Sequence, residues 1–411
     1  MRIGFFCPHS DPLAPPGAPD SGGQCVYEAR IMEAFSAMEH GVKAFTRAFD
    51  QRPSRERVAD RAEVARYAMG PEGFLRKEDM GPFLPEFSDR VVRAERDWLA
   101  AADLFHGHYW DGGVTALAAS LAFGKPLVFT SHSLGKLKQD SLPDMETYRY
   151  DIRIPAETRV MRAADTIIAL SSVERRILTE RYGVDADKIH IVPGGVEVDR
   201  FAPVMDKAGH KQELGITNEL MVFTVGRLDA RKGFLQWIEA MPVVARELER
   251  LGRSVTFMMP AGPQSPSESE AELLATMQKR VRVLGIGKHI RWFHRLSDEE
   301  IQHAYCAADL FVCPSLYEPF GLVLVEAMAA ATPVVATCHG GPVDIVREGV
   351  DGYLADPNDH EAWARRVLAV LTLDEARRRE MGQAAMQRAR ERHAWPAVAQ
   401  GIERVYAGLT A

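Results

Sequence analysis

Short apolar runs alternate with longer amphipathic stretches along nearly the whole sequence. The short runs lack the period of a helix and therefore predict buried β-strands. In the first half of the sequence, these strands are expected at Ile3–Cys7, Leu104–His106, Leu127–Ser131 and Thr166–Ala169. Strands that alternate with helices predict parallel sheets covered by helices on both faces.

The stretch after the first strand carries a clear helical pattern. Its apolar residues recur at helical spacing and form one face of a predicted helix. Gly41 is expected to end this helix, because glycine readily adopts the conformation found at helix C-termini. The residues of the apolar face are Tyr27, Ile31, Ala34, Phe35 and Met38.

The alternation of strands and helices restarts after a segment rich in Gly, Pro and charge, Pro193–Lys211. A helix is expected at Phe234–Glu249. We therefore expect an α/β protein with two Rossmann-like, doubly wound domains that face each other across a cleft, with ligands at the carboxyl ends of the strands. The strands of the second domain are expected at Met221–Val225, Val255–Met259, His289–Phe293, Leu310–Cys313 and Pro333–Ala336.

The end of the sequence predicts one more amphipathic helix. Its apolar stripe consists of Trp395, Val398, Ile402, Val405 and Tyr406. We expect residues 395–411 to join residues 1–194 in the first domain, and residues 195–394 to form the second.

Composition narrows the class of protein. The 411 residues are 46% hydrophobic and 26% charged, as in soluble globular proteins. The net charge of −7 disfavours nucleic acid as a partner, which requires a basic surface. No apolar run is long enough to span a membrane. The five cysteines form no C-x-x-C motif, so we expect reduced thiols, a cytoplasmic location and no metal site.

The motif VGRLDARKG, residues 225–233, places two cations after a predicted strand. Arg227 and Lys232 lie on the loop that leads into the next helix. Cations at the carboxyl end of a strand suit a leaving diphosphate, because they neutralise the charge that grows as the bond to the sugar breaks. The pattern predicts a diphosphate site.

The motif YEPFGLVLVEAMA, residues 317–329, also follows a predicted strand. Gly321 lets the backbone approach a ligand closely, and the helix that begins there presents free N–H groups. Glu318 and Glu326 are suitable acceptors for the hydroxyls of a sugar and a ribose. The sequence HGGPVDIV, residues 339–346, predicts a second cluster of N–H groups at the same edge.

Three further motifs lie in the first domain. Gly22-Gly23-Gln24 opens the first helix but is not G-x-G-x-x-G, which argues against a nicotinamide dinucleotide. HYWDGG, residues 108–113, and FTSHSLGKLK, residues 129–138, are expected to form loops after neighbouring strands. Histidines on two such loops, His108 and His132, favour a functional role for one of them.

Together these motifs resemble those of retaining nucleotide-sugar glycosyltransferases of the GT-B fold. Within that group the sequence is most similar to the sucrose-phosphate synthases, through GGQ, GFLRKEDMGPFL at Gly73–Leu84, HYWDGG, HSLGKLK, YEPFGLVLVEAMA and GGPVDI. Mannosylfructose-phosphate synthases, which use GDP-mannose, share much of this set. The resemblance implies transfer of glucose from UDP-glucose to fructose 6-phosphate, giving sucrose 6-phosphate and UDP.

The resemblance also implies roles for individual residues. His132, Arg227, Lys232 and Glu318 would be catalytic. The donor, UDP-glucose or another nucleotide sugar, would be bound by Gly23, Arg227, Lys232, Glu318, Phe320, Gly321, Leu322 and Glu326. The acceptor would be bound by Gly23, Gln24, Lys77, His108, Ser133, Lys138 and Arg153. The first domain would then be the acceptor-binding domain and the second the donor-binding domain.

The residues themselves support a phosphorylated acceptor. Lys77, Lys138 and Arg153 come from three separate segments, and converging cations suit a phosphate dianion. Pro155 lies two residues after Arg153, where a proline favours the beginning of a new helix.

The implied mechanism is front-face attack, in which the departing phosphate oxygen accepts the proton of the acceptor hydroxyl. The Asp-x-Asp motif of metal-dependent transferases is absent from the crevice positions, so no cofactor should be required and Mg²⁺ would at most stimulate. Three alternatives remain: a transferase with a lipid, glycan or free fructose as acceptor, a nucleotide-sugar 2-epimerase, and a sensor without activity. The sequence leaves the oligomeric state open.

Overall fold

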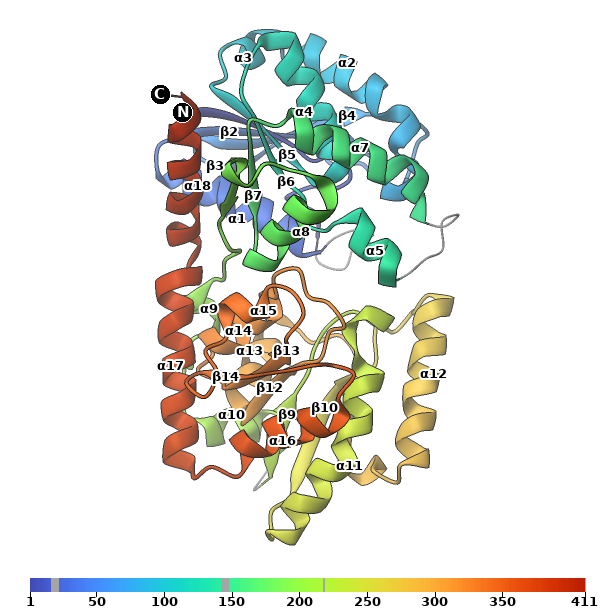
Figure 1. Cartoon of the computed structure of the whole chain (residues 1–411), viewed down its shortest axis with the longest axis vertical. Helices are drawn as coiled ribbons and strands as arrows, with labels where there is room; N and C mark the ends of the chain where they lie inside the picture. Colours follow the sequence, from blue (N-terminus) through green and yellow to red (C-terminus); the bar gives the residue numbers. More distant parts are fainter. Residues whose placement is uncertain (16–21, 142–147, 217–218, 411) are drawn as a thin grey trace. The chain divides into compact units, whose positions relative to one another are not determined.

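The computed structural model describes residues 1–15, 22–141, 148–216 and 219–410. The chain divides into two compact units (Figure 1). The first unit contains Met1–Gly194 and Trp395–Ala411, and the second contains Gly195–Ala394.

The first unit is built on a sheet that has eight strands among the described residues, in the order β3-β4-β2-β1-β5-β6-β7-β8. All neighbouring strands are parallel except β3 and β4, which pair antiparallel at one edge. The strands are β1 (Arg2–Phe6), β2 (Gly41–Ala48), β3 (Arg55–Ala59), β4 (Ala62–Ala68), β5 (Leu104–His108), β6 (Leu127–Thr130), β7 (Thr166–Ala169) and β8 (Ile189–Ile191).

Helices of the first unit cover this sheet on both faces. They are α1 (Gly23–Ala37), α2 (Leu84–Ala94), α3 (Arg96–Ala100), α4 (Tyr109–Phe123), α5 (Gly135–Ser141), α7 (Tyr150–Ala163), α8 (Ser172–Tyr182) and α18 (Trp395–Thr410).

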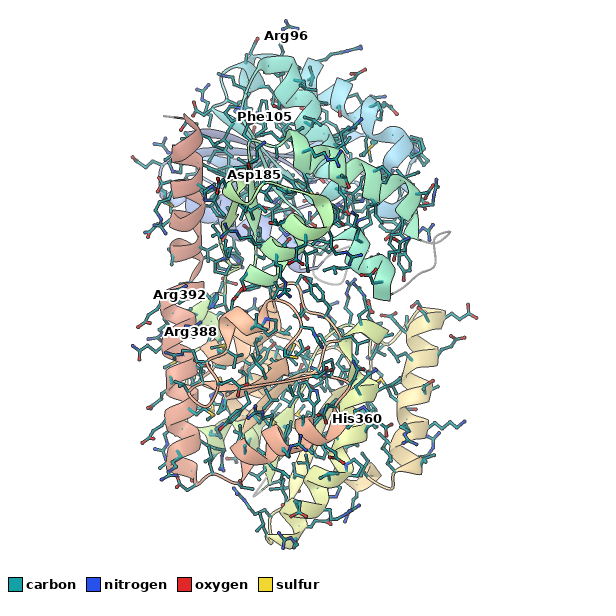
Figure 2. The ribbon with its side chains drawn as sticks, viewed as in Figure 1. Arg96, Phe105, Asp185, His360, Arg388 and Arg392 are labelled. Carbon is teal, nitrogen blue, oxygen red and sulfur yellow. The ribbon has the colours of Figure 1, made fainter. Side chains whose placement is uncertain are left out.

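Successive side chains of β1 show how the two faces are filled, because they point to opposite sides of the sheet. Phe6 packs on Phe105 in the core beneath α2, α4 and α7. Phe105 is labelled in Figure 2. Phe5 packs instead on Phe35 of α1.

Helix α18 completes the face of the sheet that α1 covers. The residues of its apolar stripe are buried except Val405, which is half-buried, and its Tyr406 ring lies 5.6 Å from the ring of Phe35. The Tyr406 hydroxyl lies 2.6 Å from Nδ1 of the buried His106 on β5. The carboxylate of Glu403 lies 2.8 Å from Nε2 of His40. The final amphipathic pattern of the sequence therefore belongs to the core of the first unit.

The second unit has a fully parallel sheet, with six strands among the described residues in the order β11-β10-β9-β12-β13-β14. One face carries a core formed around Trp237 and Trp363, and the other packs Phe223 against Tyr305 and Phe311. The strands are β9 (Leu220–Phe223), β10 (Val255–Pro260), β11 (Ile290–Phe293), β12 (Leu310–Cys313), β13 (Val334–Thr337) and β14 (Gly352–Ala355).

The helices of the second unit follow the same alternation with strands. They are α9 (Val198–Phe201), α10 (Lys207–Glu213), α11 (Phe234–Arg250), α12 (Glu268–Val283), α13 (Asp298–Ala307), α14 (Leu322–Ala329), α15 (Pro342–Ile345), α16 (His360–Leu371) and α17 (Glu375–His393). Two parallel α/β sheets with helices on both faces confirm the predicted fold class.

Several local predictions need correction. The first helix ends at Ala37, and Gly41 instead begins β2. The turn between them uses Glu39, which has a φ of 63°. Strand β9 ends at Phe223 rather than at Val225.

The described part of the chain holds no helix with both the length and the apolar character needed to cross a bilayer.

Candidate active site

In the second unit, the predicted donor residues gather at the carboxyl ends of β9, β12 and β13, which are neighbours in the sheet. Lys232 ends a 3-10 turn after β9, and Glu318 lies on the loop after β12. Nζ of Lys232 donates to Oε2 of Glu318 at 2.7 Å, and the Ser315 hydroxyl donates to the same oxygen at 3.0 Å. The two motifs named from the sequence therefore meet in one ion pair.

The charge state of Lys232 follows from this pairing. Burial alone would lower the pKa of the ammonium group, but the Glu318 carboxylate has the opposite effect and the pKa lies above its ordinary value. About a third of the Lys232 side chain is exposed. Lys232 is therefore a fixed cation that a ligand can reach.

Glycines hold the loop of Glu318 in place. Glu318 donates its backbone N–H to the carbonyl of His339, and its own carbonyl accepts from the N–H of Gly341. Gly340 has a φ of 102°, and a Cβ there would lie 2.0 Å from the Glu318 carbonyl oxygen. Only glycine fits at such a contact. The sequence HGGPVDIV thus positions Glu318.

The predicted sugar-binding backbone lies next to this loop. Gly321 has a φ of 109° and immediately precedes α14, which begins at Leu322. Phe320 is buried, and its ring lies 5.7 Å from the ring of His393. Because the first N–H groups of a helix have no partner within the helix, the start of α14 can donate to hydroxyl oxygens.

The second carboxylate of the motif has a separate partner. Oε2 of Glu326 accepts a hydrogen bond from the Tyr305 hydroxyl at 2.7 Å. Burial raises the pKa of Glu326, and the Tyr305 hydrogen bond opposes that rise. Tyr305 supplies the partner that a carboxylate among apolar residues needs.

Replacing Tyr305 by Phe should lower the free energy of unfolding by about 1 kcal/mol, because the Glu326 carboxylate then loses its donor. Chemical denaturation measures this change. Tyr353→Phe is the matched control, since the Tyr353 hydroxyl makes no hydrogen bond within the described residues. Equal losses in both variants would show that the Tyr305 bond contributes nothing.

Arg227 differs from Lys232. It is exposed on the loop after β9 and makes no hydrogen bond or ion pair within the described part of the chain. The two cations are therefore not equivalent, since Lys232 is held by Glu318 and Arg227 is available for an incoming anion.

In the first unit, the two predicted histidines meet. His108 ends β5, and His132 follows the adjacent strand β6. Nδ1 of His108 lies 3.0 Å from Nε2 of His132. Burial, with a smaller contribution from His9, lowers the pKa of His132 to about 3, so its ring is neutral. His132 also has a φ of 52°, which is unusual for a residue with a side chain.

The segments that carry these residues differ from the predicted loops. HYWDGG forms no loop, because β5 passes directly into α4 at Tyr109. This close approach of α4 to β1 requires glycine at position 112, because a Cβ there would lie 2.1 Å from the Phe6 carbonyl oxygen. Lys136 and Lys138 lie on α5 rather than on a loop.

Two of the predicted acceptor cations converge. Nζ of Lys77 lies 3.8 Å and Nζ of Lys138 lies 3.4 Å from Oε1 of Glu78. Nζ of Lys138 also lies 4.0 Å from the centroid of the Tyr148 ring. Two ammonium groups from separate segments of the first unit therefore lie close to the same carboxylate, that of Glu78.

Arg153 has different surroundings. It is buried, and its guanidinium donates to Oε2 of Glu157 at 3.1 Å and to the carbonyl and hydroxyl oxygens of Ser133 at 2.7 and 3.0 Å. It also lies 4.6 Å from the centroid of the Tyr109 ring. Arg153 is thus already engaged by protein groups.

Pro155 does not begin a helix, contrary to the prediction. It lies inside α7, which starts at Tyr150. The proline is exposed, so the carbonyl group one turn earlier, at Asp151, can be solvated instead of accepting its missing N–H.

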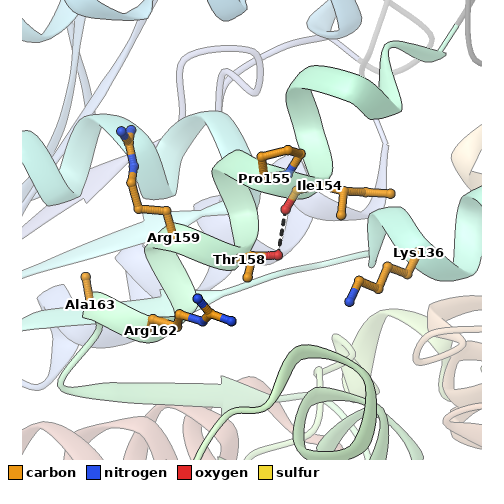
Figure 3. A pocket seen from close by; sticks show the side chains of 7 residues that line it. All are labelled: Lys136, Ile154, Pro155, Thr158, Arg159, Arg162 and Ala163. Carbon is orange, nitrogen blue, oxygen red and sulfur yellow. Dashed lines mark hydrogen bonds between the residues drawn. The ribbon is translucent and has the colours of Figure 1, made fainter.

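An open hollow lies beside this part of α7 (Figure 3). It is lined by Lys136, Ile154, Pro155, Thr158, Arg159, Arg162 and Ala163. None of the residues predicted to bind donor or acceptor lines it. Lys136 donates to the carbonyl of Arg181 and lies over the Tyr182 ring.

The remaining predicted residues of this unit lie at the start of α1. Gly23 is its first residue, and Nε2 of Gln24 donates to Oε1 of Glu28 at 2.8 Å. Sequence reasoning missed Glu28, Glu78, Glu157 and Tyr305, which contact predicted residues. The i, i+4 spacing of Gln24 and Glu28, and of Arg153 and Glu157, could have indicated two of these contacts.

Comparison with known proteins defines the class. Residues 21–200 match the family described as glycosyltransferase family 4, and residues 206–388 match glycosyl transferases group 1. The chain is 34% identical over 417 residues to the D-inositol 3-phosphate glycosyltransferase of Corynebacterium efficiens. This similarity covers 100% of this chain and 96% of that protein. The chain therefore belongs to the glycosyltransferases of the GT-B fold.

Two other proteins are similar over the whole chain. The mannosylfructose-phosphate synthase of Agrobacterium fabrum is 30% identical over 423 residues, covering 100% of this chain and 92% of that protein. The structure of sucrose-phosphate synthase from Thermosynechococcus elongatus has a TM-score of 0.86 at 27% identity, covering 100% of this chain and 99% of that one. The resemblance inferred from the sequence motifs is confirmed.

Proposed function

We propose that this glycosyltransferase moves a glucosyl unit from UDP-glucose to fructose 6-phosphate, with retention of configuration, and releases sucrose 6-phosphate and UDP. The observation that carries the acceptor half is the convergence of Lys77 and Lys138 on one carboxylate. A phosphate dianion can replace that carboxylate between the two ammonium groups. The three similar proteins support this choice, because each of their names contains a phosphorylated sugar or polyol.

The donor half of the proposal uses the residues around Lys232. Lys232 and Arg227 would neutralise the diphosphate, Glu326 would accept from the ribose hydroxyls, and Glu318 would accept from hydroxyls of the glucosyl unit. The backbone at Phe320, Gly321 and Leu322 would donate to the same sugar. The ion pair with Glu318 holds Lys232 in place before the donor binds. Charges that are positioned in advance in this way stabilise a transition state most strongly.

The proposed reaction breaks the bond between the anomeric carbon and the β-phosphate oxygen and forms a bond to the acceptor hydroxyl. The departing phosphate oxygen accepts the hydroxyl proton on the same face of the sugar. His132 would lie near the reacting centre, while Gly23, Gln24, His108, Ser133 and Arg153 would complete the acceptor side. We propose that no metal ion is required, since protein cations stabilise the leaving group.

The similar proteins support one alternative donor and one alternative acceptor. GDP-mannose would be the donor if the chain acts as a mannosylfructose-phosphate synthase, and an inositol phosphate would be the acceptor if it acts as the inositol relative does. A matrix of UDP-glucose, ADP-glucose and GDP-mannose against fructose 6-phosphate, fructose and inositol 3-phosphate, read by product mass, separates these cases. Equal use of fructose and fructose 6-phosphate would contradict a phosphate site.

Replacing Lys138 by Ala should raise the KM for fructose 6-phosphate about tenfold and leave donor hydrolysis unchanged, because one charged contact to the phosphate is lost. Steady-state kinetics with each substrate varied in turn measures both effects. Lys125→Ala, a lysine of the same unit outside the predicted site, is the control. A donor KM that rises as much as the acceptor KM would assign Lys138 to another role.

A further inference from the structure

A cluster of side chains capable of binding a metal lies in the first unit. Glu28 belongs to α1, His108 ends β5, and His132 follows β6. One carboxylate oxygen and one nitrogen of each ring lie within 4.8 Å of one another. Glu28 and His108 are fully buried, and His132 is half-buried. The fold therefore brings together three potential ligands from three separate elements.

Glu28 has no countercharge, as it forms no ion pair with any described residue. Its two oxygens accept hydrogen bonds from neutral groups, the Ser10 hydroxyl and the Gln24 amide, each at 2.8 Å. A buried carboxylate without a cation is costly, whereas hydrogen bonds of this kind typically orient the carboxylate of a metal site.

The two histidines have suitable geometry. Nitrogen ligands lie about 2.0–2.1 Å from Zn²⁺, so two of them at the tetrahedral angle are about 3.3–3.4 Å apart. Nδ1 of His108 and Nε2 of His132 are 3.0 Å apart, so the two rings would move apart by about 0.3–0.4 Å to accept the ion. Without an ion, one of these two nitrogens donates its N–H to the other, and a bound ion would replace that proton.

Two polar atoms in this region are buried without a hydrogen-bond partner among the described residues. They are Nε2 of His108 and the hydroxyl of Tyr27. The Tyr27 ring lies 5.1 Å from the ring of His132. Because buried polar groups in folded proteins nearly always have partners, these two atoms indicate that a further group binds in this region, although Nε2 of His108 is not the nitrogen that faces His132.

We propose that Glu28, His108 and His132 bind a divalent transition-metal ion, for which Zn²⁺ is the best match. Two imidazoles and one carboxylate form a three-ligand zinc set with a fourth position open. Mg²⁺ is a poor candidate, because it prefers oxygen ligands. Because the ligand atoms lie within 4.8 Å of one another, closing the carboxylate onto the ion requires a movement of at most about 1.5 Å, given zinc–oxygen distances near 2.0–2.2 Å.

The bound ion should inhibit sugar transfer. It would occupy the lone pairs of His108 and His132, which the proposed function places on the acceptor side and at the reacting centre. The inhibition rests on the proposed function, whereas the binding of the ion does not.

Binding is tested on the full chain, without a polyhistidine tag, after dialysis against a chelator. Titration with Co²⁺ should produce d–d absorption typical of nitrogen and oxygen ligands, and Zn²⁺ should displace it at one equivalent per chain. Calorimetry with Zn²⁺ should show at least about 100-fold weaker binding in Glu28→Gln, since loss of a ligand exceeds loss of a supporting group. Glu33→Gln is the matched control, because Glu33 lies on the same helix and pairs with Arg30 at the surface.

Three results would overturn the site: no saturable Co²⁺ spectrum in the wild-type chain, unchanged Zn²⁺ affinity in Glu28→Gln, or sulfur-to-cobalt charge-transfer bands. The last would assign the ion to a cysteine, such as Cys7 or Cys25, whose thiols lie near Glu28. The spectrum of the wild-type chain decides the ligand type even if a variant fails to fold. Zinc binding with the expected spectrum but without inhibition would support the site and contradict the role proposed for His132.

Discussion

Replacing Lys232 by Ala should lower kcat about 100- to 1,000-fold, the effect typical of removing one preorganised charge contact at a reacting centre. The ammonium group is held 2.7 Å from Glu318 before any donor binds, and its pKa is raised, so it is charged throughout the working range of the enzyme. The loss should fall on kcat more than on the donor KM, because charge on the diphosphate grows as the bond breaks. Steady-state kinetics with saturating acceptor measures it.

Lys279→Ala controls for the loss of a lysine in the same unit, since Lys279 is exposed on α12. Thermal unfolding of both variants checks the fold, because Lys232→Ala also leaves the Glu318 carboxylate without its cation. A Lys232→Ala enzyme with wild-type kcat and only a raised donor KM would limit Lys232 to donor binding in the ground state.

Replacing Arg153 by Ala should lower the free energy of unfolding by about 3–5 kcal/mol, because it leaves the Glu157 carboxylate buried without its cation. The Gly135 N–H and the Tyr182 hydroxyl are then its remaining donors among the described residues. The side chains of Arg153 and Glu157 are 3% and 1% exposed, so water cannot compensate the loss. The guanidinium also satisfies the Ser133 carbonyl, which would lose its donor. Denaturant titration of the purified variant measures the change.

Arg159→Ala is the matched control on the same helix, since Arg159 is exposed and pairs with no described residue. Exposed ion pairs contribute less than about 1 kcal/mol to stability. If Arg153→Ala lowers the free energy of unfolding by less than that and greatly raises the KM of the phosphorylated acceptor, Arg153 binds phosphate as the sequence predicted. The experiment therefore separates the structural role that the contacts indicate from the role that the sequence suggested.

The parts of the fold that sequence patterns predicted share a physical property. Strands such as Leu310–Cys313 and Thr166–Ala169 are buried on both faces by apolar residues, so each is visible as a continuous apolar run. The strand β2 was missed because it carries Lys43 and Arg47, which interrupt the run. Lys43 is nevertheless buried, because it pairs with Glu63 and Glu95. Partners so distant in sequence leave no local signal.

In the candidate site, too, some features could be predicted from the local sequence and others could not. Arg227, Lys232, Glu318 and Glu326 were named because strand ends, a glycine and a helix start mark their positions. Nothing local indicated that Lys232 would pair with Glu318, 86 residues away, or that Lys138 would approach Glu78, 60 residues away. Residue type and position could be predicted, whereas the pairing of charges depends on tertiary contacts.

The place of α18 in the first unit has a consequence for synthesis and engineering. Residues 195–394 are an insertion between two pieces of one folding unit, so the ribosome must complete the second unit before the first can acquire its last helix. During that interval the surface around Phe35 and His106 lacks Tyr406. Joining residue 194 to residue 395 through a short linker should therefore give an independently folding first unit, whereas truncation before Trp395 should leave it prone to aggregation.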